Sequence, residues 1–126
     1  MNMILAIAIG GGLGSVARHY AVSAAAGLWG QNFPYGTLIV NIIGSFIIGA
    51  IMEGFALKWQ VSQEVRAFLV TGCLGGFTTF SAFSFDTLKL IDTNNYVPAA
   101  LYILLSVGLS LTAIFMAVHL IRGVFA

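Results

Sequence analysis

The sequence predicts an all-α integral membrane protein with four transmembrane helices. Hydrophobic residues make up 60% of the 126 residues, and charged residues only 7%. Soluble domains carry about 25% charged residues, and a small soluble domain buries only about 60–70% of its surface. So much apolar surface therefore requires lipid. Four segments also have the roughly 20 predominantly apolar residues that cross a bilayer as a helix.

The four predicted spans cover residues 3–26, 37–57, 66–90 and 97–121, within one transmembrane domain over residues 1–126. The first span lacks a basic leader and an obvious cleavage site, so we do not expect a removable signal peptide. The joins between the spans are short. An even number of spans places both chain ends on the same side of the membrane.

The first span combines close-packing glycines with one buried charge. Gly10 and Gly14 are four residues apart, a spacing that lets helix backbones approach closely in lipid. Arg18 is the one basic residue deep in a span. Because a charge in lipid is costly, we expect Arg18 to snorkel or to pair. It is also a candidate for drawing anions toward a vestibule.

The second and fourth spans each carry polar residues four apart, which places them along one face of a helix. The two stripes are Thr37, Asn41 and Ser45, and Tyr102, Ser106 and Ser110. Their side chains are neutral hydrogen-bonding groups. Since no acidic ring accompanies them, they favour an anion over a cation as the passenger. Hydrogen bonding between helices is the alternative role.

The third span is the most unusual part of the chain. Gly75 and Gly76 precede Thr78 and Thr79, and glycine in a helix interior costs about 1 kcal/mol relative to alanine. We therefore predict a helix break near the middle of this span. Unwound backbone offers carbonyl groups that coordinate cations in transporters. An unbroken helix, with glycines that only pack, is the alternative.

Phenylalanine rings follow the predicted break. Phe80 and Phe83 are three residues apart and share one helical face. An aromatic ring has a positive edge, so these rings can present that edge to a small anion. The alternative is that they pack or face lipid.

The distribution of basic residues barely selects an orientation. Lys58, Arg66 and Arg122 fall on the side of the chain ends, and Lys89 and Arg18 fall toward the other side. Orientation follows the Lys and Arg bias of short loops, and this bias is small. Copies inserted in both directions can pair as an antiparallel two-fold dimer. A single orientation is the alternative.

Several functional classes lack their residue patterns. No Ser/His/Asp grouping or Cys/His metal spacing occurs, so the sequence does not predict an enzyme. Cys73 is the single cysteine, which excludes a disulfide within the chain. A net charge of +1 gives no basic field for nucleic acid.

The chain resembles the bacterial fluoride channel family of the Fluc or CrcB type over almost its whole length. The resemblance rests on residues 11–14 with Arg18, on residues 36–41, and most strongly on residues 75–81, which read GGFTTFS. It implies an antiparallel, dual-topology homodimer in the bacterial inner membrane with two pores for passive fluoride efflux, which limits fluoride toxicity.

The resemblance also implies roles for individual residues. The predicted fluoride pathway consists of Asn41 and Ser110 as donors, Phe80 and Phe83 as ring edges, Tyr102 nearby, and Thr37 and Ser81. A structural sodium ion, which is not transported, is expected between the subunits. In this chain its backbone carbonyl ligands correspond to Gly75 and Thr78.

Two other functions remain open at this point. A small proton-coupled multidrug exporter has a similar size, but it depends on an acidic residue deep in the first span, where this chain carries Arg18 instead. A non-transporting assembly subunit would use the polar stripes only to join helices.

Overall fold

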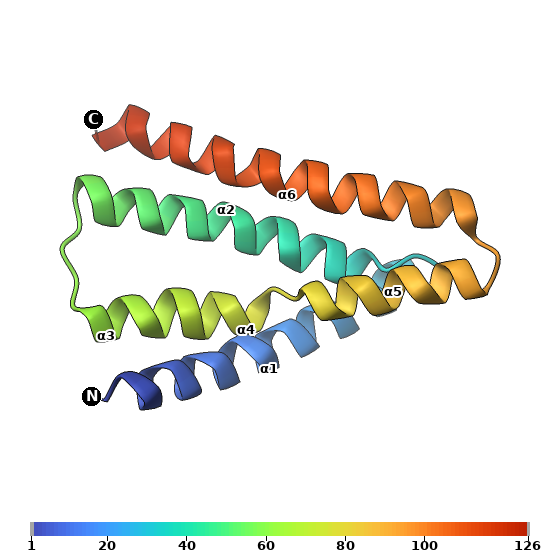
Figure 1. Ribbon diagram of the computed structural model, residues 1–126, viewed down its shortest axis with the longest axis horizontal. Helices are drawn as coiled ribbons and strands as arrows, with labels where there is room; N and C mark the ends of the chain where they lie inside the picture. The colour runs from blue at the N-terminus through green and yellow to red at the C-terminus, as the bar shows by residue number, and fades with distance from the viewer. Residues whose placement is uncertain (1, 126) are drawn as a thin grey trace.

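The computed structural model describes residues 2–125 and is entirely helical over that range. The chain passes back and forth along one long axis, and both ends lie at the same end of the molecule (Figure 1). In chain order the elements are α1 (Met3–Trp29), α2 (Tyr35–Leu57), α3 (Gln63–Arg66), the π-helix η1 (Ala67–Leu74), α4 (Gly75–Phe77), α5 (Phe80–Asp92) and α6 (Tyr96–Phe125).

Three of the helical segments are long and apolar enough to cross a membrane, by length and composition: α2, residues 63–92, and α6. The remaining predicted span, α1, is outside this set although it has 27 residues. Its glycines, Arg18 and His19 lower its hydropathy. At 1.5 Å per residue α1 is about 40 Å long, and it packs along the third span.

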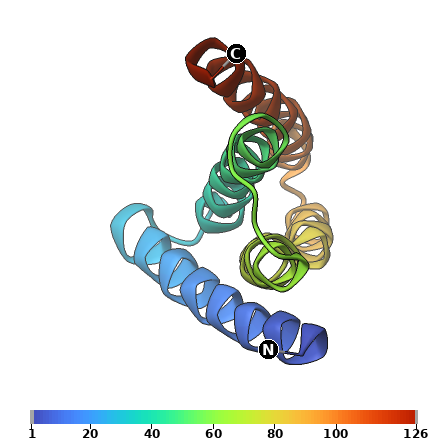
Figure 2. The same ribbon diagram turned by 90° about the vertical axis from the view of Figure 1, so that its left-hand side faces the viewer.

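The helices form an open arrangement rather than a closed bundle. Viewed end-on, α1 and α6 lie on opposite flanks, with α2 and the broken third span between them (Figure 2). The buried core is small and contains Leu38, Leu90, Ala99 and Tyr102. Large apolar side chains are exposed along α1 and α6, which suits helices that face lipid or a second copy.

The third span is broken, as predicted, but not at the glycines. Gly75 remains helical, with φ −63° and ψ −36°. The extended residues are Thr78, with ψ 156°, and Thr79, with ψ 119°. Threonine favours this conformation because its branched side chain is restricted in a helix, and its hydroxyl can replace a lost backbone hydrogen bond.

The glycines of the first and third spans have a packing role instead. A Cβ atom on Gly14 would overlap the Cys73 carbonyl, and one on Gly76 would overlap the Gly11 carbonyl. The predicted pair Gly10 and Gly14 therefore joins α1 to Gly72 and Gly76 of the third span within one chain. This contact coincides with η1, an eight-residue π-helix that the sequence did not predict.

The end of the molecule that carries both chain ends is rich in charged and aromatic groups. Arg122 Nε lies 3.0 Å from Glu53 Oε1. The Arg66 guanidinium lies 5.1 Å from the Phe55 ring centroid. Such residues are typical of a membrane–water interface.

Candidate functional site

The break in the third span is closed by hydrogen bonds from its own threonines. Thr78 Oγ1 donates to the Leu74 carbonyl at 2.9 Å. Thr79 Oγ1 accepts from Ala82 N–H at 3.1 Å, which caps the N-terminus of α5. Two extended residues can therefore interrupt the helix without leaving these groups unsatisfied.

Asn41 of α2 bridges the same break. The Thr79 N–H donates to Asn41 Oδ1 at 2.8 Å, and Asn41 Nδ2 donates to the Thr79 carbonyl at 3.1 Å. The amide thus pairs with both polar backbone groups of Thr79. An asparagine amide has two N–H donors, and only one is used in the described part of the chain. The sequence predicted an anion donor here and gave hydrogen bonding between helices as the alternative, and Asn41 makes such a bond while keeping one N–H unused.

A pocket of about 480 Å³, here called the break pocket, opens beside these residues. It brings together the predicted residues Asn41, Phe80, Phe83, Ser110, Gly75 and Thr78. Ser45, Thr79 and Ser106 also line it. Among residues 2–125, no Asp, Glu, Lys or Arg lines this pocket. Its polar groups are therefore neutral.

Ser106 is a lining residue that the predicted pathway did not include. Its side chain is buried, and its Oγ has no hydrogen-bond partner among residues 2–125. Buried hydroxyl groups nearly always have a hydrogen-bond partner in the protein or in water. A buried hydroxyl without one, beside a pocket, therefore indicates a binding position for a small polar ligand. The stripe formed with Tyr102 and Ser110 was the signal in the sequence.

The two predicted phenylalanines occupy different positions in the break pocket. Their ring centroids are 5.5 Å apart and the rings are tilted by 49°. Phe83 is partly buried, whereas Phe80 is 77% exposed. Phe80 therefore reaches beyond this chain, toward lipid or a second copy.

Tyr102 of α6 lines neither the break pocket nor a second pocket nearby, but it contacts lining residues of both. Its ring is fully buried and lies 5.1 Å from the Phe83 ring and 5.6 Å from the Phe33 ring. Its hydroxyl donates to Asp86 Oδ2 at 3.1 Å. The sequence did not predict this pairing, which turns the hydroxyl away from the break pocket.

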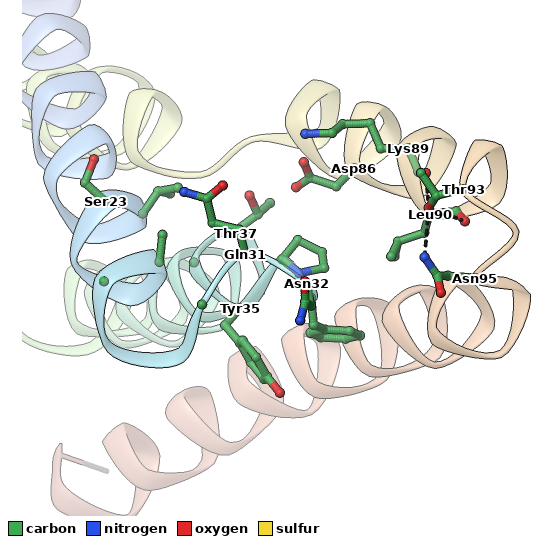
Figure 3. Close-up of a pocket in the computed structure, with 17 residues that line it drawn as sticks. Ser23, Gln31, Asn32, Tyr35, Thr37, Asp86, Lys89, Leu90, Thr93 and Asn95 are labelled. Carbon is green, nitrogen blue, oxygen red and sulfur yellow. Dashed lines mark hydrogen bonds between the residues drawn. The ribbon is translucent and has the colours of Figure 1, made fainter.

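Asp86 and Thr37 line this second pocket, here called the loop pocket because the α1–α2 loop forms one wall. Its volume is about 790 Å³. Figure 3 shows the Asp86 carboxylate and the Thr37 hydroxyl turned toward the same space. Thr37 is thus one helical turn before Asn41 but belongs to the loop pocket.

Two other predicted residues lie outside both pockets. Ser81 Oγ lies 3.2 Å from Thr79 Oγ1 on an exposed face. Arg18 is partly buried, and its Nε has no hydrogen-bond partner within the described residues. Their predicted roles in the pathway and in anion attraction remain predictions.

The backbone at the break fits the carbonyl ligands expected for a cation. The Thr79 N–H, which would bond to the Gly75 carbonyl in a continuous helix, donates to Asn41 instead. The extended backbone of Thr78 takes its carbonyl out of the helical ladder. Gly75 is also exposed. Within residues 2–125 no group of three or more His, Cys, Asp or Glu offers an alternative metal site.

Comparisons with known proteins agree with this architecture. Residues 5–118 match the family model described as CrcB-like protein, Camphor Resistance (CrcB). A relative from Granulibacter bethesdensis is 49% identical, over 97% of this chain and 96% of its own length. One from Nitrobacter winogradskyi is 48% identical, over 96% of each chain.

A more distant relative, from a Roseiflexus species, is 44% identical, over 94% of this chain and 96% of its own length. All three relatives carry the name fluoride-specific ion channel FluC. The family match covers most of the chain, and the relatives match almost end to end. The chain is therefore a member of the CrcB-like family, which includes these channels.

Proposed function

We propose that this protein is a fluoride-specific ion channel that lets fluoride leave the cell passively across the bacterial inner membrane. The relatives named as fluoride channels match it over nearly their whole length. The break pocket is the observation that carries the proposal within the chain, because it combines neutral donors with aromatic rings and no formal charge.

These groups suit the passage of a small, strongly hydrated anion. Hydrogen-bond donors must replace the water that fluoride loses, and the unused Asn41 N–H, the Ser106 hydroxyl and the Ser110 hydroxyl are available beside the pocket. The ring edges of Phe80 and Phe83 add weak positive potential. Because no fixed cation lines the pocket, an anion is not trapped there, which conduction requires.

The conducting form that we propose is an antiparallel homodimer with two pores. The exposed Phe80 ring and the open side of the break pocket leave a surface that a second copy can complete. The small bias in basic residues allows insertion in both directions. Two-fold pairing would then bring the exposed Gly75 backbones of the two copies together.

A sodium ion would be held between the copies by the carbonyl oxygens of Gly75 and Thr78. Such an ion would join the two broken helices and would not be transported. This part of the proposal is tested by preparing the protein without sodium. We expect the dimer to lose stability and flux, and full activity and an intact dimer in sodium-free buffer would argue against the bridge.

Reconstitution tests the channel function itself. Liposomes containing the protein are loaded with potassium fluoride, valinomycin is added to carry the balancing potassium, and a fluoride electrode follows release. We expect rapid release of fluoride, with chloride retained in a parallel chloride experiment. No release would contradict the proposal, and release that depends on a proton gradient would favour a proton-coupled exporter.

A further inference from the structure

The loop pocket and the break pocket lie on consecutive turns of the same helices. On α2, Thr37 lines the loop pocket and Asn41 lines the break pocket. On α5, Asp86 and Phe83 have the same relation. Tyr102 contacts lining residues of both pockets through Phe83 and Asp86. The two spaces therefore form neighbouring compartments, with Tyr102 between them.

Lys89 is the one basic residue that lines the loop pocket within the described part of the chain. Its Nζ lies 5.6 Å from the Phe85 ring centroid, and it makes no ion pair among residues 2–125. In Figure 3 the Lys89 side chain extends along the same side of α5 as the Asp86 carboxylate. Lys89 thus brings a positive charge, without a carboxylate partner in the described part of the chain, to the wall of the pocket.

The charges in the loop pocket pose a problem for an anion. Asp86 places a carboxylate in the wall of this pocket, where it also accepts a hydrogen bond from Tyr102. A cation in the same cavity offsets this repulsion, and charge in a concave site raises the local concentration of counter-ions. Arg18 cannot do this within the chain, since it lines neither pocket.

We propose that the loop pocket is an anion vestibule of the pathway and that Lys89 makes it accessible by offsetting the charge of Asp86. Gln31 and Asn32 add neutral donors at its wall. This inference rests on the proposed channel function. It goes beyond that function because it gives a residue outside the break pocket the role of attracting fluoride to the pathway.

The first test compares Lys89→Gln with wild type in the efflux assay at low fluoride. At an ionic strength of about 0.01 M the Debye length is about 30 Å, and at about 0.15 M it is about 8 Å. Potassium isethionate raises the ionic strength without changing fluoride. We expect about two- to fourfold slower efflux at low ionic strength, with the difference shrinking at the higher one.

Matched variants separate electrostatics from structure. Lys89→Arg keeps the charge and should conduct like wild type. Lys58→Gln removes the same charge at a residue that lines neither pocket, so its efflux should change little. Adding Asp86→Asn to Lys89→Gln should restore most of the loss. An equal loss in Lys58→Gln, or a loss that ionic strength does not change, would overturn the proposal.

A second test varies the charge in one folded protein. Lys89→Cys is made in a Cys73→Ala background, which removes the single native thiol. Attaching a cationic ethylammonium group by a methanethiosulfonate reagent should speed efflux, and an anionic ethylsulfonate group should slow it. Equal effects of the two reagents would overturn the vestibule while leaving the channel intact. A wild-type protein that releases no fluoride would overturn both.

Discussion

The two halves of the broken third span do different work although they belong to one predicted helix. The first half, η1 and α4, packs its backbone against α1 through Gly72 and Gly76. The second half, α5, contributes Phe80 and Phe83 to the break pocket and Asp86 to the loop pocket. The first half thus joins the third span to α1, although Val70, Leu74 and Gly75 of this half also line the break pocket. The second half supplies both phenylalanine rings of the break pocket and the Asp86 carboxylate of the loop pocket.

The difference between the two halves follows from the short break that separates them. Thr78 and Thr79 are extended, and Asn41 takes over the backbone bonds that the helix loses. The backbone beyond the break is therefore anchored by α2 rather than by the preceding turn. We infer that the break is a defined structural feature, since the Thr78 hydroxyl and the N–H, carbonyl and hydroxyl groups of Thr79 all have specific partners.

The largest effect should come from a charge in the break pocket. Asn41→Asp places a carboxylate where an anion passes and removes the donor to the Thr79 carbonyl. Two like charges about 4 Å apart at an effective dielectric of about 20 repel by about 4 kcal/mol, which corresponds to about a thousandfold in rate. Fluoride efflux from liposomes measures this loss.

Size-exclusion chromatography of Asn41→Asp must accompany that measurement, because the change also touches the break. A folded variant without flux supports the pathway. Normal flux would contradict a pore-lining position for Asn41.

The next largest effect should come from disrupting the contact between α1 and the first half of the third span. Gly14→Leu forces a side chain into the Cys73 carbonyl, whose backbone cannot turn away. Overpacking of this kind costs about 3 kcal/mol or more when backbone must move, so the yield of folded protein should fall sharply. Gly12→Leu is the control, because a Cβ at Gly12 meets no atom within 4 Å. Equal yields would contradict the glycine contact.

A smaller effect should follow the replacement of an aromatic ring on α5. Phe83→Leu keeps an apolar side chain but removes the ring edge beside the break pocket. Aromatic interactions of this class contribute about 1 kcal/mol, so we expect about a fivefold slower efflux. Phe115, which is 71% exposed on α6, provides the control Phe115→Leu. A similar loss in both variants would mean that the effect is not local.

The smallest effect should come from the α5 cap. Thr79→Ala removes the hydroxyl that accepts from Ala82 N–H, and loss of an N-cap typically costs about 1 kcal/mol. Thermal unfolding in detergent should show a midpoint a few degrees lower. Thr79→Ser keeps the hydroxyl and should unfold like wild type. If serine fails to rescue, the cap is not the cause.

The polar stripes, the helix break and the glycine contact could be predicted from the spacing of residues in the sequence. The polar stripes placed Asn41 and Ser110 on faces that meet at one pocket. The GGFTTFS segment predicted a break, because glycine and threonine both weaken helices. The pair Gly10 and Gly14 predicted close backbone contact, which the structure places between α1 and the third span.

Other features depend on contacts that spacing does not contain. The π-helix η1 packs on α1, and no residue pattern signals it. The bidentate pairing of Asn41 with Thr79 joins residues 38 positions apart. Tyr102 was expected beside the break pocket, but its buried hydroxyl donates to Asp86, which lines the loop pocket.

The central claim is that the anion passes through the break pocket, and that the exposed part of η1 outside this pocket takes no part in conduction. Silver ion binding to introduced thiols tests this most directly, in a Cys73→Ala background and chloride-free solution. Ser110→Cys lies in the break pocket, and Thr71→Cys lies on an exposed part of η1 outside it. Silver should stop most fluoride efflux through Ser110→Cys and leave Thr71→Cys unchanged. Equal sensitivity, or none at Ser110→Cys, would contradict the account.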